Sequence, residues 1–469
     1  MLLTVAVRTF DLVIVGTGSG NSILDQRFGD WNVAIVEKGV FGGTCLNVGC
    51  IPTKMFVHTA DLAATPAASA RLGVDSTLDG VRWGDIRDRI FGRIDPIASG
   101  GREYRVSHAD NANVTVFEGT GRFTAPKVLE VTLPDGTSET ITAPKFVLAA
   151  GGRAVVPDVP GLADVGYETS DTIMRLDKLP EKLTILGSGF VAAEFAHVFS
   201  SYGVDVTVVA RSGALLRRED DEISERFTEL ASARWDVRLD RKSVRAERAG
   251  DVVRLHLEGP SGAETVESDV LLVAVGRTPN SDILDTTAGG IATVPTGHVV
   301  VDDHQQTTVD GVYALGDISS PYELKHVANH EARVVQHNLL HPEDRKASDH
   351  RFVPHAVFTS PQIASVGLTE REAAASHQRY VVAVQNYSDI AYGWAMEDTT
   401  GFVKLLADPV TGQLLGAHIM GPQAASVIQP LIQAMSFGLP AHEMARGQYW
   451  IHPGMPEVVE NALLKLELE

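Results

Sequence analysis

Two cysteines, Cys45 and Cys50, are the residues of this sequence with the clearest capacity for chemistry. They are the only cysteines among 469 residues and stand close together in the stretch GGTCLNVGC. A structural disulfide across so short a loop would stabilise the fold by only roughly 2 kcal/mol in the chain-entropy model. Two unpaired core cysteines are the alternative, but the surroundings are rich in glycine and polar residues. We therefore predict a pair that opens and closes as a redox-active disulfide.

The composition restricts the partners and the compartment of such a pair. Hydrophobic residues at 44% and charged residues at 21% are ordinary for a globular protein, and the length suggests about three domains. The net charge of −20 argues against nucleic acid and anionic membrane surfaces as partners. The longest apolar runs, such as VLLVAVG, are too short to span a bilayer, and MLLTVAVRTFD lacks the features of a signal peptide. We expect a cytoplasmic protein, and in the reducing cytoplasm a permanent disulfide is uncommon.

A dinucleotide-binding pattern stands near the start of the chain. Residues 11–15, DLVIV, are expected to form a buried parallel strand that runs into GTGSGN at 16–21. A helical stretch and a second strand, WNVAIVEK, should follow. Gly16 allows the tight turn, and Gly18 lets the backbone approach a pyrophosphate at the N-terminus of the helix. The pattern predicts a nucleotide site.

The rest of this pattern holds one expected residue and one departure. Glu37 ends the second strand, where a carboxylate accepts hydrogen bonds from a ribose. The third glycine position, which serves close packing of helix on strand, holds Asn21. We expect either a wider crossing or compensation by Gly20.

The pattern returns between residues 183 and 210. The run LTIL leads into GSGFVAAE at 187–194, then a helix to about Tyr202, a stop at Gly203 and the strand VDVTVVA. The fingerprint positions of this second unit are Gly187, Gly189 and Ala192.

The charges after the second strand of this unit differ from those of the first. Arg211 stands at the strand end and Arg217 and Arg218 follow, whereas Asp205 lies at the start, the wrong end for a ribose. Cations where an acid would favour NAD indicate a 2′-phosphate, hence NADPH. The alternative is a solvated arginine face. Two dinucleotide units and a cysteine pair suggest that electrons pass from a nicotinamide through a flavin to a disulfide.

Over its whole length the sequence resembles the pyridine nucleotide–disulfide oxidoreductases of the glutathione reductase and dihydrolipoamide dehydrogenase type. The resemblance is carried by GGTCLNVGCIPTK (42–54), AAGGR (149–153), GRTPN (276–280), YALGD (313–317) and HPGMPE (452–457). Two local sequences, GTGSGN and YWIHP, resemble those of the branch of this family that reduces mycothione, which is the disulfide of mycothiol.

The resemblance implies roles for four residues. Cys50 would be the flavin-side thiolate, and Cys45 the interchange thiol that attacks the substrate disulfide. His452 would act as acid and base on the partner subunit's cysteines, oriented by Glu457, so the protein would work as a homodimer. Read without the family, His452 and Glu457 are a loop residue and a first-turn acid.

The resemblance also assigns cofactor contacts for FAD and NADPH. Lys54 and Glu194 would form an ion pair near flavin and nicotinamide, Asp317 would bind the ribityl chain, and Phe190 replaces a gating tyrosine. Further positions in the matching motifs are Gly16, Gly18, Gly20, Glu37, Lys38, Gly43, Thr44, Gly151, Gly187, Gly189, Ala192, Arg211, Arg217, Gly276 and Arg277. No resident metal is expected.

The expected fold class is α/β, with two Rossmann-like dinucleotide-binding domains and an α+β C-terminal dimerisation domain. The FAD-binding domain would be discontinuous, at 1–157 and 285–348. The NADPH-binding domain would occupy 158–284 and the interface domain 349–469. PDVPG and GRTPN carry the turn residues expected at the crossings.

These features predict an NADPH-dependent flavoenzyme that reduces a low-molecular-weight disulfide, with mycothione favoured. The alternatives are an NAD-linked dihydrolipoamide dehydrogenase, a glutathione-type reductase and, in a different class, a non-catalytic flavoprotein scaffold. The arginines argue against the first of these. Large thioredoxin reductases and mercuric reductases need further cysteines near a terminus, and the chain has none.

Overall fold

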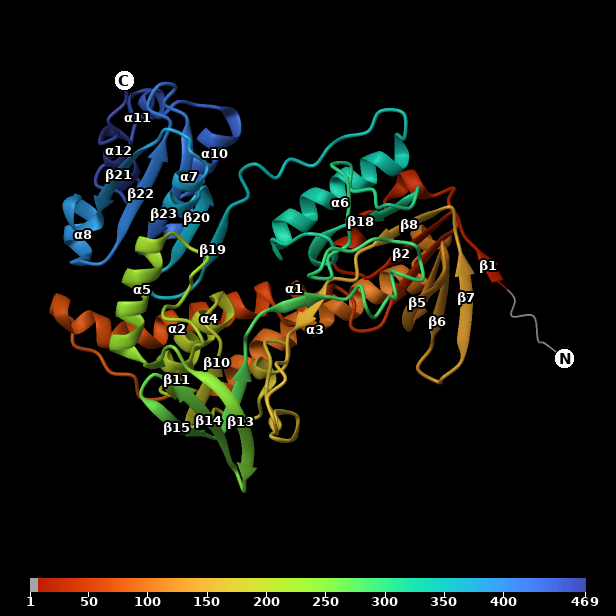
Figure 1. Cartoon of the computed structure of the whole chain (residues 1–469), viewed down its shortest axis with the longest axis horizontal. Helices are drawn as coiled ribbons and strands as arrows, with labels where there is room; N and C mark the ends of the chain where they lie inside the picture. Colours follow the sequence, from red (N-terminus) through yellow and green to blue (C-terminus); the bar gives the residue numbers. More distant parts are fainter. Residues whose placement is uncertain (1–6) are drawn as a thin grey trace. The chain divides into compact units, whose positions relative to one another are not determined.

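The computed structural model describes residues 7–469, which fall into two compact units (Figure 1). The first unit comprises the chain up to Thr53, Arg87–Val155 and Arg277–His350. The second comprises Lys54–Ile86, Val156–Gly276 and Arg351–Glu469. The division of the second unit into a nucleotide-binding and an interface domain stays a prediction. The prediction that MLLTVAVRTFD is not a signal peptide concerns a stretch whose first six residues lie outside the described ones.

The first unit is built on a parallel sheet with strand order β18-β8-β2-β3-β4. Leu12 and Ile14 of the central strand enter one hydrophobic cluster, and Val13 and Val15 enter another. Both faces of the sheet are therefore covered, which is why this strand reads as a continuous apolar run. The strands are β2 (Leu12–Val15), β3 (Val33–Glu37), β4 (Val114–Glu118), β8 (Lys145–Leu148) and β18 (Val312–Ala314).

Different elements cover the two faces of this sheet. Helix α6 (Lys325–Leu340) packs Ala332, Val335 and Leu339 into the cluster of Leu12. The opposite cluster takes side chains from a second sheet of order β1-β7-β6-β5. That sheet consists of β1 (Val7–Thr9), β5 (Thr120–Ala125), β6 (Val128–Thr132) and β7 (Ser138–Thr142). A short pair joins β9 (Gly152–Ala154) to β17 (Arg277–Pro279).

Three further helices belong wholly or partly to this unit. The short helix α1 (Gly43–Asn47) precedes α2 (Cys50–Ser69). The third is α3 (Trp83–Ser107). Both α2 and α3 run from one unit into the other, at residues 53–54 and 86–87.

The prediction of a helix between the first two strands is wrong. The chain forms only two 3-10 turns there, Ser19–Ser22 and Gln26–Phe28. Asp25 caps the second turn by accepting a hydrogen bond from the Arg27 N–H. Serine, asparagine and aspartate side chains offer the backbone such local alternatives to a helix, and this segment is rich in them.

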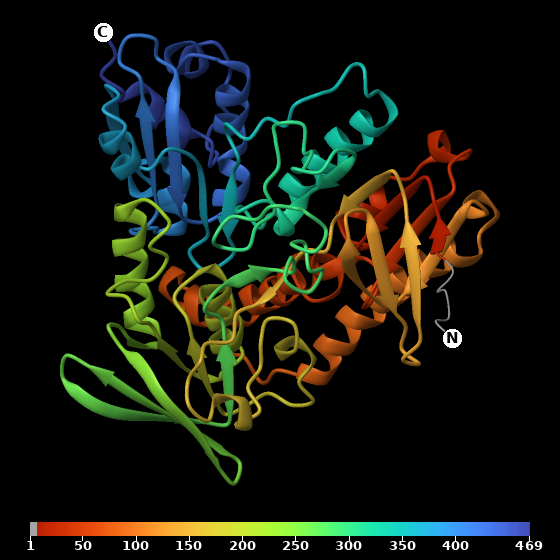
Figure 2. The same ribbon diagram turned by 45° about the vertical axis from the view of Figure 1, so that its right-hand side comes forward.

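The second unit contains the predicted second dinucleotide fold. Its parallel sheet has the order β12-β11-β10-β16, from β10 (Lys182–Leu186), β11 (Asp205–Val209), β12 (Asp236–Arg238) and β16 (Val270–Val273). Helix α4 (Phe190–Ser201) follows the glycine turn and ends before Gly203 at φ +87°, so this prediction is confirmed. Helix α5 (Asp221–Arg234) and an antiparallel sheet complete the fold (Figure 2). That sheet contains β13 (Lys242–Ala249), β14 (Val252–Gly259) and β15 (Gly262–Ser268).

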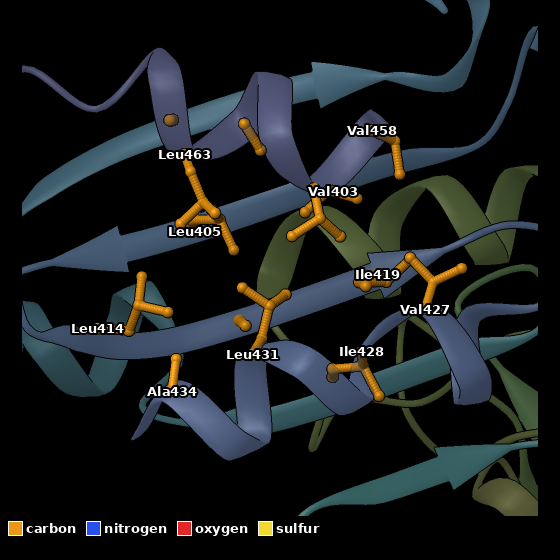
Figure 3. Close-up of a cluster of buried hydrophobic side chains, with 14 of the residues drawn as sticks. Val403, Leu405, Leu414, Ile419, Val427, Ile428, Leu431, Ala434, Val458 and Leu463 are labelled. Atoms are coloured by element: carbon orange, nitrogen blue, oxygen red, sulfur yellow. The ribbon is translucent and has the colours of Figure 1, made fainter. Parts of the chain in front are cut away.

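The C-terminal part of the second unit is an antiparallel sheet with helices packed on it. The strand order is β19-β20-β23-β22-β21. Figure 3 shows Val403 and Leu405 of this sheet beside Leu431 and Leu463 from the helices. The strands are β19 (His355–Val357), β20 (Ile363–Gly367), β21 (Val381–Asn386), β22 (Phe402–Ala407) and β23 (Leu414–Met420). The helices are α7 (Glu370–Ala375), α8 (Ala391–Met396), α9 (Ala424–Val427), α10 (Gln429–Phe437), α11 (Ala441–Arg446) and α12 (Glu457–Leu464).

The predicted fold class is therefore confirmed: two Rossmann-like folds and an α+β C-terminal part. Within residues 7–469, every helix is too short or too polar to cross a membrane.

Candidate active site

The two cysteines lie on either side of a helix start. Cys45 is half-buried in α1, and the exposed Cys50 opens the 20-residue helix α2. The pKa of the Cys45 thiol is lowered to about 7, mainly because the Cys50 thiol donates a hydrogen bond to it, while burial opposes the shift. The positive charge of Lys325 and the backbone N–H groups of Cys50 and Ile51 lower the pKa further. The N–H groups at the start of α2 thus favour a thiolate on Cys45.

The same hydrogen bond acts in the opposite sense on Cys50. Donating it to Cys45 raises the pKa of Cys50, and burial and the negative charge of Cys45 add to the increase. When this pair of free thiols loses one proton, the negative charge therefore lies on Cys45 and the remaining proton on Cys50. The assignment of Cys50 as flavin-side thiolate stays a prediction, because a group bound beside Cys50 changes which sulfur keeps the proton.

The first dinucleotide fold gathers the predicted FAD residues at one sheet edge. Strands β2, β3, β8 and β18 are parallel, so the segments that follow them meet at their carboxyl ends. Gly16 has φ +101°, and a Cβ atom there would lie 2.3 Å from the Ala149 carbonyl oxygen. A Cβ atom on Gly43 would lie 2.7 Å from the Gly18 Cα. Only glycine fits these positions, which leaves the backbone open to a pyrophosphate.

Glu37 lies at this edge with its carboxylate fixed. Its Oε2 accepts hydrogen bonds from the Thr17 N–H at 2.8 Å and the Thr17 hydroxyl at 2.7 Å, and its Oε1 from the Gly39 N–H at 2.8 Å. The Thr17 hydroxyl also accepts a hydrogen bond from the Gly42 N–H at 3.2 Å. Thr17 thereby joins the nucleotide turn to the cysteine motif.

Gly20 takes the packing role expected of the third glycine. A Cβ atom there would lie 2.7 Å from the Ala149 Cβ and 3.2 Å from Ile14. Of the two alternatives for Asn21, compensation by Gly20 is thus the one that the packing supports.

Asp317 follows β18 at the same edge. Burial raises the pKa of its carboxyl, with the charge of Arg277 opposing. The preceding Gly316 N–H donates to the buried Glu331 carboxylate at 2.7 Å, and the Arg277 guanidinium donates to the Gly152 carbonyl at 2.8 Å. A half-buried carboxyl on a fixed turn suits the hydroxyls of a ribityl chain. The residues at this edge fit FAD.

The second dinucleotide fold holds the predicted NADPH residues. Gly187 has φ +147°, and a Cβ atom there would lie 2.2 Å from the Ala274 carbonyl oxygen. Gly189 caps α4, and the space that its side chain would fill is open. The twelve-residue helix therefore presents its N-terminal N–H groups to an anion. Ala192 is buried, and Phe190, at the helix start, is 43% exposed.

The three arginines that follow β11 are exposed. Arg211 stands two residues after the strand, and Arg217 and Arg218 follow in the same loop. The Ser212 and Ser188 hydroxyls, 3.3 Å apart, join this loop to the glycine turn. Exposed cations beside a nucleotide turn fit a 2′-phosphate.

Buried acids anchor the end of the arginine loop. Glu219 accepts hydrogen bonds from His355 at 2.8 Å and from the Ser365 hydroxyl at 2.8 Å. Asp220 accepts one from Lys404 at 2.8 Å, and Lys404 also lies 2.7 Å from Glu370. Although burial raises the pKa of Asp220, these contacts hold it below its usual value. The arginine loop is thus fixed to the C-terminal sheet of the same unit.

Lys54 and Glu194 surround one phenylalanine. The Lys54 ammonium, one turn beyond Cys50 in α2, lies 3.8 Å from the centre of the Phe358 ring. Glu194, in α4, accepts the Phe358 N–H at 2.8 Å. Burial lowers the pKa of Lys54, although part of its side chain is exposed, and the charges of Asp61 and Glu194 oppose the shift. The structure places these groups within electrostatic reach, and their ion pair at the cofactors stays a prediction.

His452 and Glu457 form the close pair that the motif predicts. The His452 Nδ1 lies 2.6 Å from the Glu457 Oε1, and the side chains are 69% and 17% exposed. Glu457 opens α12, and the Gly454 N–H donates to its second oxygen at 3.3 Å. The carboxylate keeps the proton on Nδ1 and leaves Nε2 free to exchange a proton at the surface.

Comparison with known proteins decides the family. Residues 10–332 match the pyridine nucleotide-disulphide oxidoreductase family, and residues 353–463 match the dimerisation domain of the same family. The chain belongs to the pyridine nucleotide-disulphide oxidoreductases. It is therefore an oxidoreductase, and the predicted cofactors, FAD and NADPH, are confirmed. The dimerisation domain supports a homodimer.

Individual relatives cover nearly the whole chain. Mycothione reductase of Mycobacterium tuberculosis is 55% identical over 98% of this chain and 100% of its own. Mercuric reductase of Streptomyces lividans is 34% identical over 93% and 92%, and dihydrolipoyl dehydrogenase of Corynebacterium glutamicum 31% over 97% and 97%. Among solved structures, the HOCl-induced flavoprotein disulfide reductase RclA of Escherichia coli matches with a TM-score of 0.83, 28% identity, and coverage of 97% and 99%.

Sequence reasoning missed three residues of this oxidoreductase. Thr17 lies inside the fingerprint GTGSGN, so the sequence motif could have indicated its position in the nucleotide turn. Asn47 lies inside the cysteine motif, and its buried amide donates to the carbonyls of Phe41 at 2.8 Å and Gly43 at 3.0 Å. Lys325 donates to the Ser19 hydroxyl at 2.7 Å and lowers the pKa of Cys45, and no local pattern marks it.

Proposed function

We propose that the protein reduces mycothione, the disulfide of mycothiol, with electrons from NADPH. The relative that is named mycothione reductase, with 55% identity over 98% of the chain, is the observation that carries the choice of substrate. The free Cys45–Cys50 pair at a helix N-terminus supports disulfide exchange, because it supplies an ionisable attacking thiol and a neighbouring thiol to resolve the product.

The exchange uses both cysteines in turn. The Cys45 thiolate attacks one sulfur of the substrate, forms a mixed disulfide and releases one mycothiol as thiolate. The Cys50 thiolate then attacks the Cys45 sulfur, which releases the second mycothiol and closes the Cys45–Cys50 disulfide. FAD, when bound, supplies the route by which two electrons from NADPH open that disulfide again.

The leaving thiolates need a proton donor. We assign this role to His452 of the partner subunit, oriented by Glu457 of the same partner. In each protomer the His452 ring is exposed and has a carboxylate on one nitrogen, so its other nitrogen is available to a group outside that protomer. A single protomer would then lack a complete site, and the homodimer would be the active form.

The preference for NADPH over NADH rests on the exposed arginines after β11. We assign Arg211 and Arg217 to the 2′-phosphate. Asp205, the acid of this segment, begins the strand and so lies at the opposite end from these arginines. Lys54 and Glu194 would face the flavin and the nicotinamide. A reducing cytoplasm is the compartment we propose, because there a cysteine pair cycles rather than staying oxidised.

The decisive experiment is NADPH oxidation by the purified protein with mycothione, glutathione disulfide and lipoamide in turn. Turnover with mycothione well above the other two is the expected result. Turnover with lipoamide that is faster with NADH would assign the chain to the dihydrolipoamide branch. A Cys45→Ser variant is the control, since NADPH oxidation that survives it does not pass through the cysteine pair.

A further inference from the structure

A buried arginine holds the nucleotide turn that replaces the missing first helix. Arg105 lies in α3 and is 7% exposed. Its Nε donates to the Asn21 side-chain oxygen at 2.8 Å, and its Nη2 donates to the Asn21 carbonyl at 2.7 Å and to the Leu24 carbonyl at 3.3 Å. Its Nη1 donates to the side-chain oxygen of Asn111 at 2.6 Å.

These hydrogen bonds do what the next turn of a helix would do. In an α-helix, the carbonyls of Asn21 and Leu24 would accept bonds from N–H groups four residues further along. Here the helical conformation ends after the 3-10 turn Ser19–Ser22, so the Arg105 guanidinium supplies the hydrogen-bond donors instead. The guanidinium therefore lies at the carbonyl end of the turn whose glycines face the pyrophosphate position.

The charge of Arg105 is not neutralised locally. Its four hydrogen-bond acceptors are neutral oxygens, and among residues 7–469 no carboxylate forms an ion pair with it. Arg102, one turn earlier in α3, is the contrast, because it is about half exposed and bonded to Glu118. Burying a cation without an anion is costly, and an anionic ligand nearby would offset that cost.

We propose that Arg105 is a positioning residue for FAD that, together with Lys325 on the Ser19 hydroxyl, gives the nucleotide turn positive potential in place of a helix dipole. The inference rests on the FAD site proposed above. A full α-helix presents about half a positive charge at its N-terminus, and a single 3-10 turn presents much less. A whole buried charge fixed to the same turn would make up the difference for a pyrophosphate.

The test separates the charge from the hydrogen bonds. Asn21→Asp keeps the size of the side chain and its acceptor oxygen, and within residues 7–469 the Asn21 amide nitrogen donates no hydrogen bond that the change would remove. The carboxylate would strengthen the grip on Arg105 while cancelling its charge. Arg105→Lys keeps the positive charge but loses the planar guanidinium that binds several acceptors at once. Arg105→Gln loses both the charge and the guanidinium. Arg102→Gln is the matched control on the same helix.

Each variant is purified with its FAD, and the rate of FAD release is followed by flavin fluorescence. The far-ultraviolet circular dichroism spectrum checks that the fold is retained. We expect Asn21→Asp and Arg105→Gln to release FAD faster by on the order of tenfold or more, because each removes the net local charge. Arg105→Lys should stay within a few-fold of the wild type, and Arg102→Gln should equal it.

Release from Asn21→Asp at or below the wild-type rate would overturn the proposal, because a residue that only clamps the turn gains from a carboxylate. Release from Arg105→Lys as fast as from Arg105→Gln would overturn it too. A wild-type protein that carries no FAD would instead contradict the proposed FAD site, so the two failures are distinguishable.

Discussion

The low pKa of Cys45 can be measured on the sulfur itself. Because the chain holds only two cysteines, alkylation of the reduced protein with iodoacetamide reports on Cys45 and Cys50 alone, and peptide mapping distinguishes them. The pKa of Cys45 is about 7, so about half of it is thiolate at pH 7. An ordinary cysteine with a pKa of about 8.5 is about 3% thiolate at that pH. The thiolate population is thus greater by roughly 15-fold.

The rate of alkylation gains less than the population does. A thiolate of lower pKa is a weaker nucleophile, with a Brønsted slope of about 0.4–0.5, so a shift of about 1.5 in pKa reduces its intrinsic reactivity by roughly 5-fold. The net advantage at pH 7 is only about 3-fold. The midpoint of the pH–rate profile is therefore the quantity to measure, since it reports the pKa directly.

The expected midpoint for Cys45 lies near pH 7 in the reduced wild-type protein. Removing the donor in Cys50→Ala should raise this midpoint most, because the hydrogen bond from Cys50 is the main cause of the shift. Lys325→Met should raise it less. A wild-type midpoint near 8.5, or one that Cys50→Ala does not move, would refute the explanation by hydrogen bonding to the Cys45 sulfur.

Three further predictions concern other residues. His452→Ala should leave reduction of bound FAD by NADPH intact but slow mycothione turnover by about 10² or more in stopped-flow and steady-state assays, and unchanged turnover would exclude the acid–base role. Arg211→Glu combined with Arg217→Ala should raise KM for NADPH far more than for NADH, and an equal rise would remove the 2′-phosphate argument. Lys404→Met should lower the free energy of unfolding by about 3–5 kcal/mol in urea titrations, because it leaves the buried Asp220 carboxylate without its cation; the exposed Arg371→Met control should cost less than about 1 kcal/mol, and equal losses would contradict the role of Lys404 as the counter-charge of Asp220.

The local patterns predicted those parts of the fold whose causes are local. The strand at 11–15, the glycine turn at Gly187 and the stop at Gly203 each follow from apolar periodicity and from positive φ angles that favour glycine. The pair His452–Glu457, by contrast, was expected only from the family resemblance, because the local pattern alone gives a loop residue and a first-turn acid.

The failures have non-local causes. The first helix of the FAD fold is absent although strand, glycines and acid are all present, and its carbonyls are satisfied by Arg105, 84 positions further along the chain. Lys325 reaches Ser19 across 306 positions. The arginine loop is fixed through Lys404, which lies 184 positions from Asp220. Patterns within short stretches of a single sequence do not indicate partners that lie so far apart along the chain.

The position of the cysteine pair explains why the two thiols differ before any ligand binds. Cys50 is the first residue of α2, so its own N–H and that of Ile51 point back toward the preceding residues, where the Cys45 sulfur accepts them. The Cys50 N–H also lowers the pKa of Cys50, but hydrogen bonding of its thiol to Cys45 and burial outweigh this effect. The spacing of five residues thus lets the Cys50 thiol and the N–H groups at the start of α2 lower the pKa of Cys45. An anionic Cys45 suits attack on a substrate disulfide, and the proton kept on Cys50 must leave before Cys50 can resolve the mixed disulfide. The negative charge on Cys45 that holds this proton is gone in the mixed disulfide. Formation of the mixed disulfide therefore itself eases the loss of the proton from Cys50.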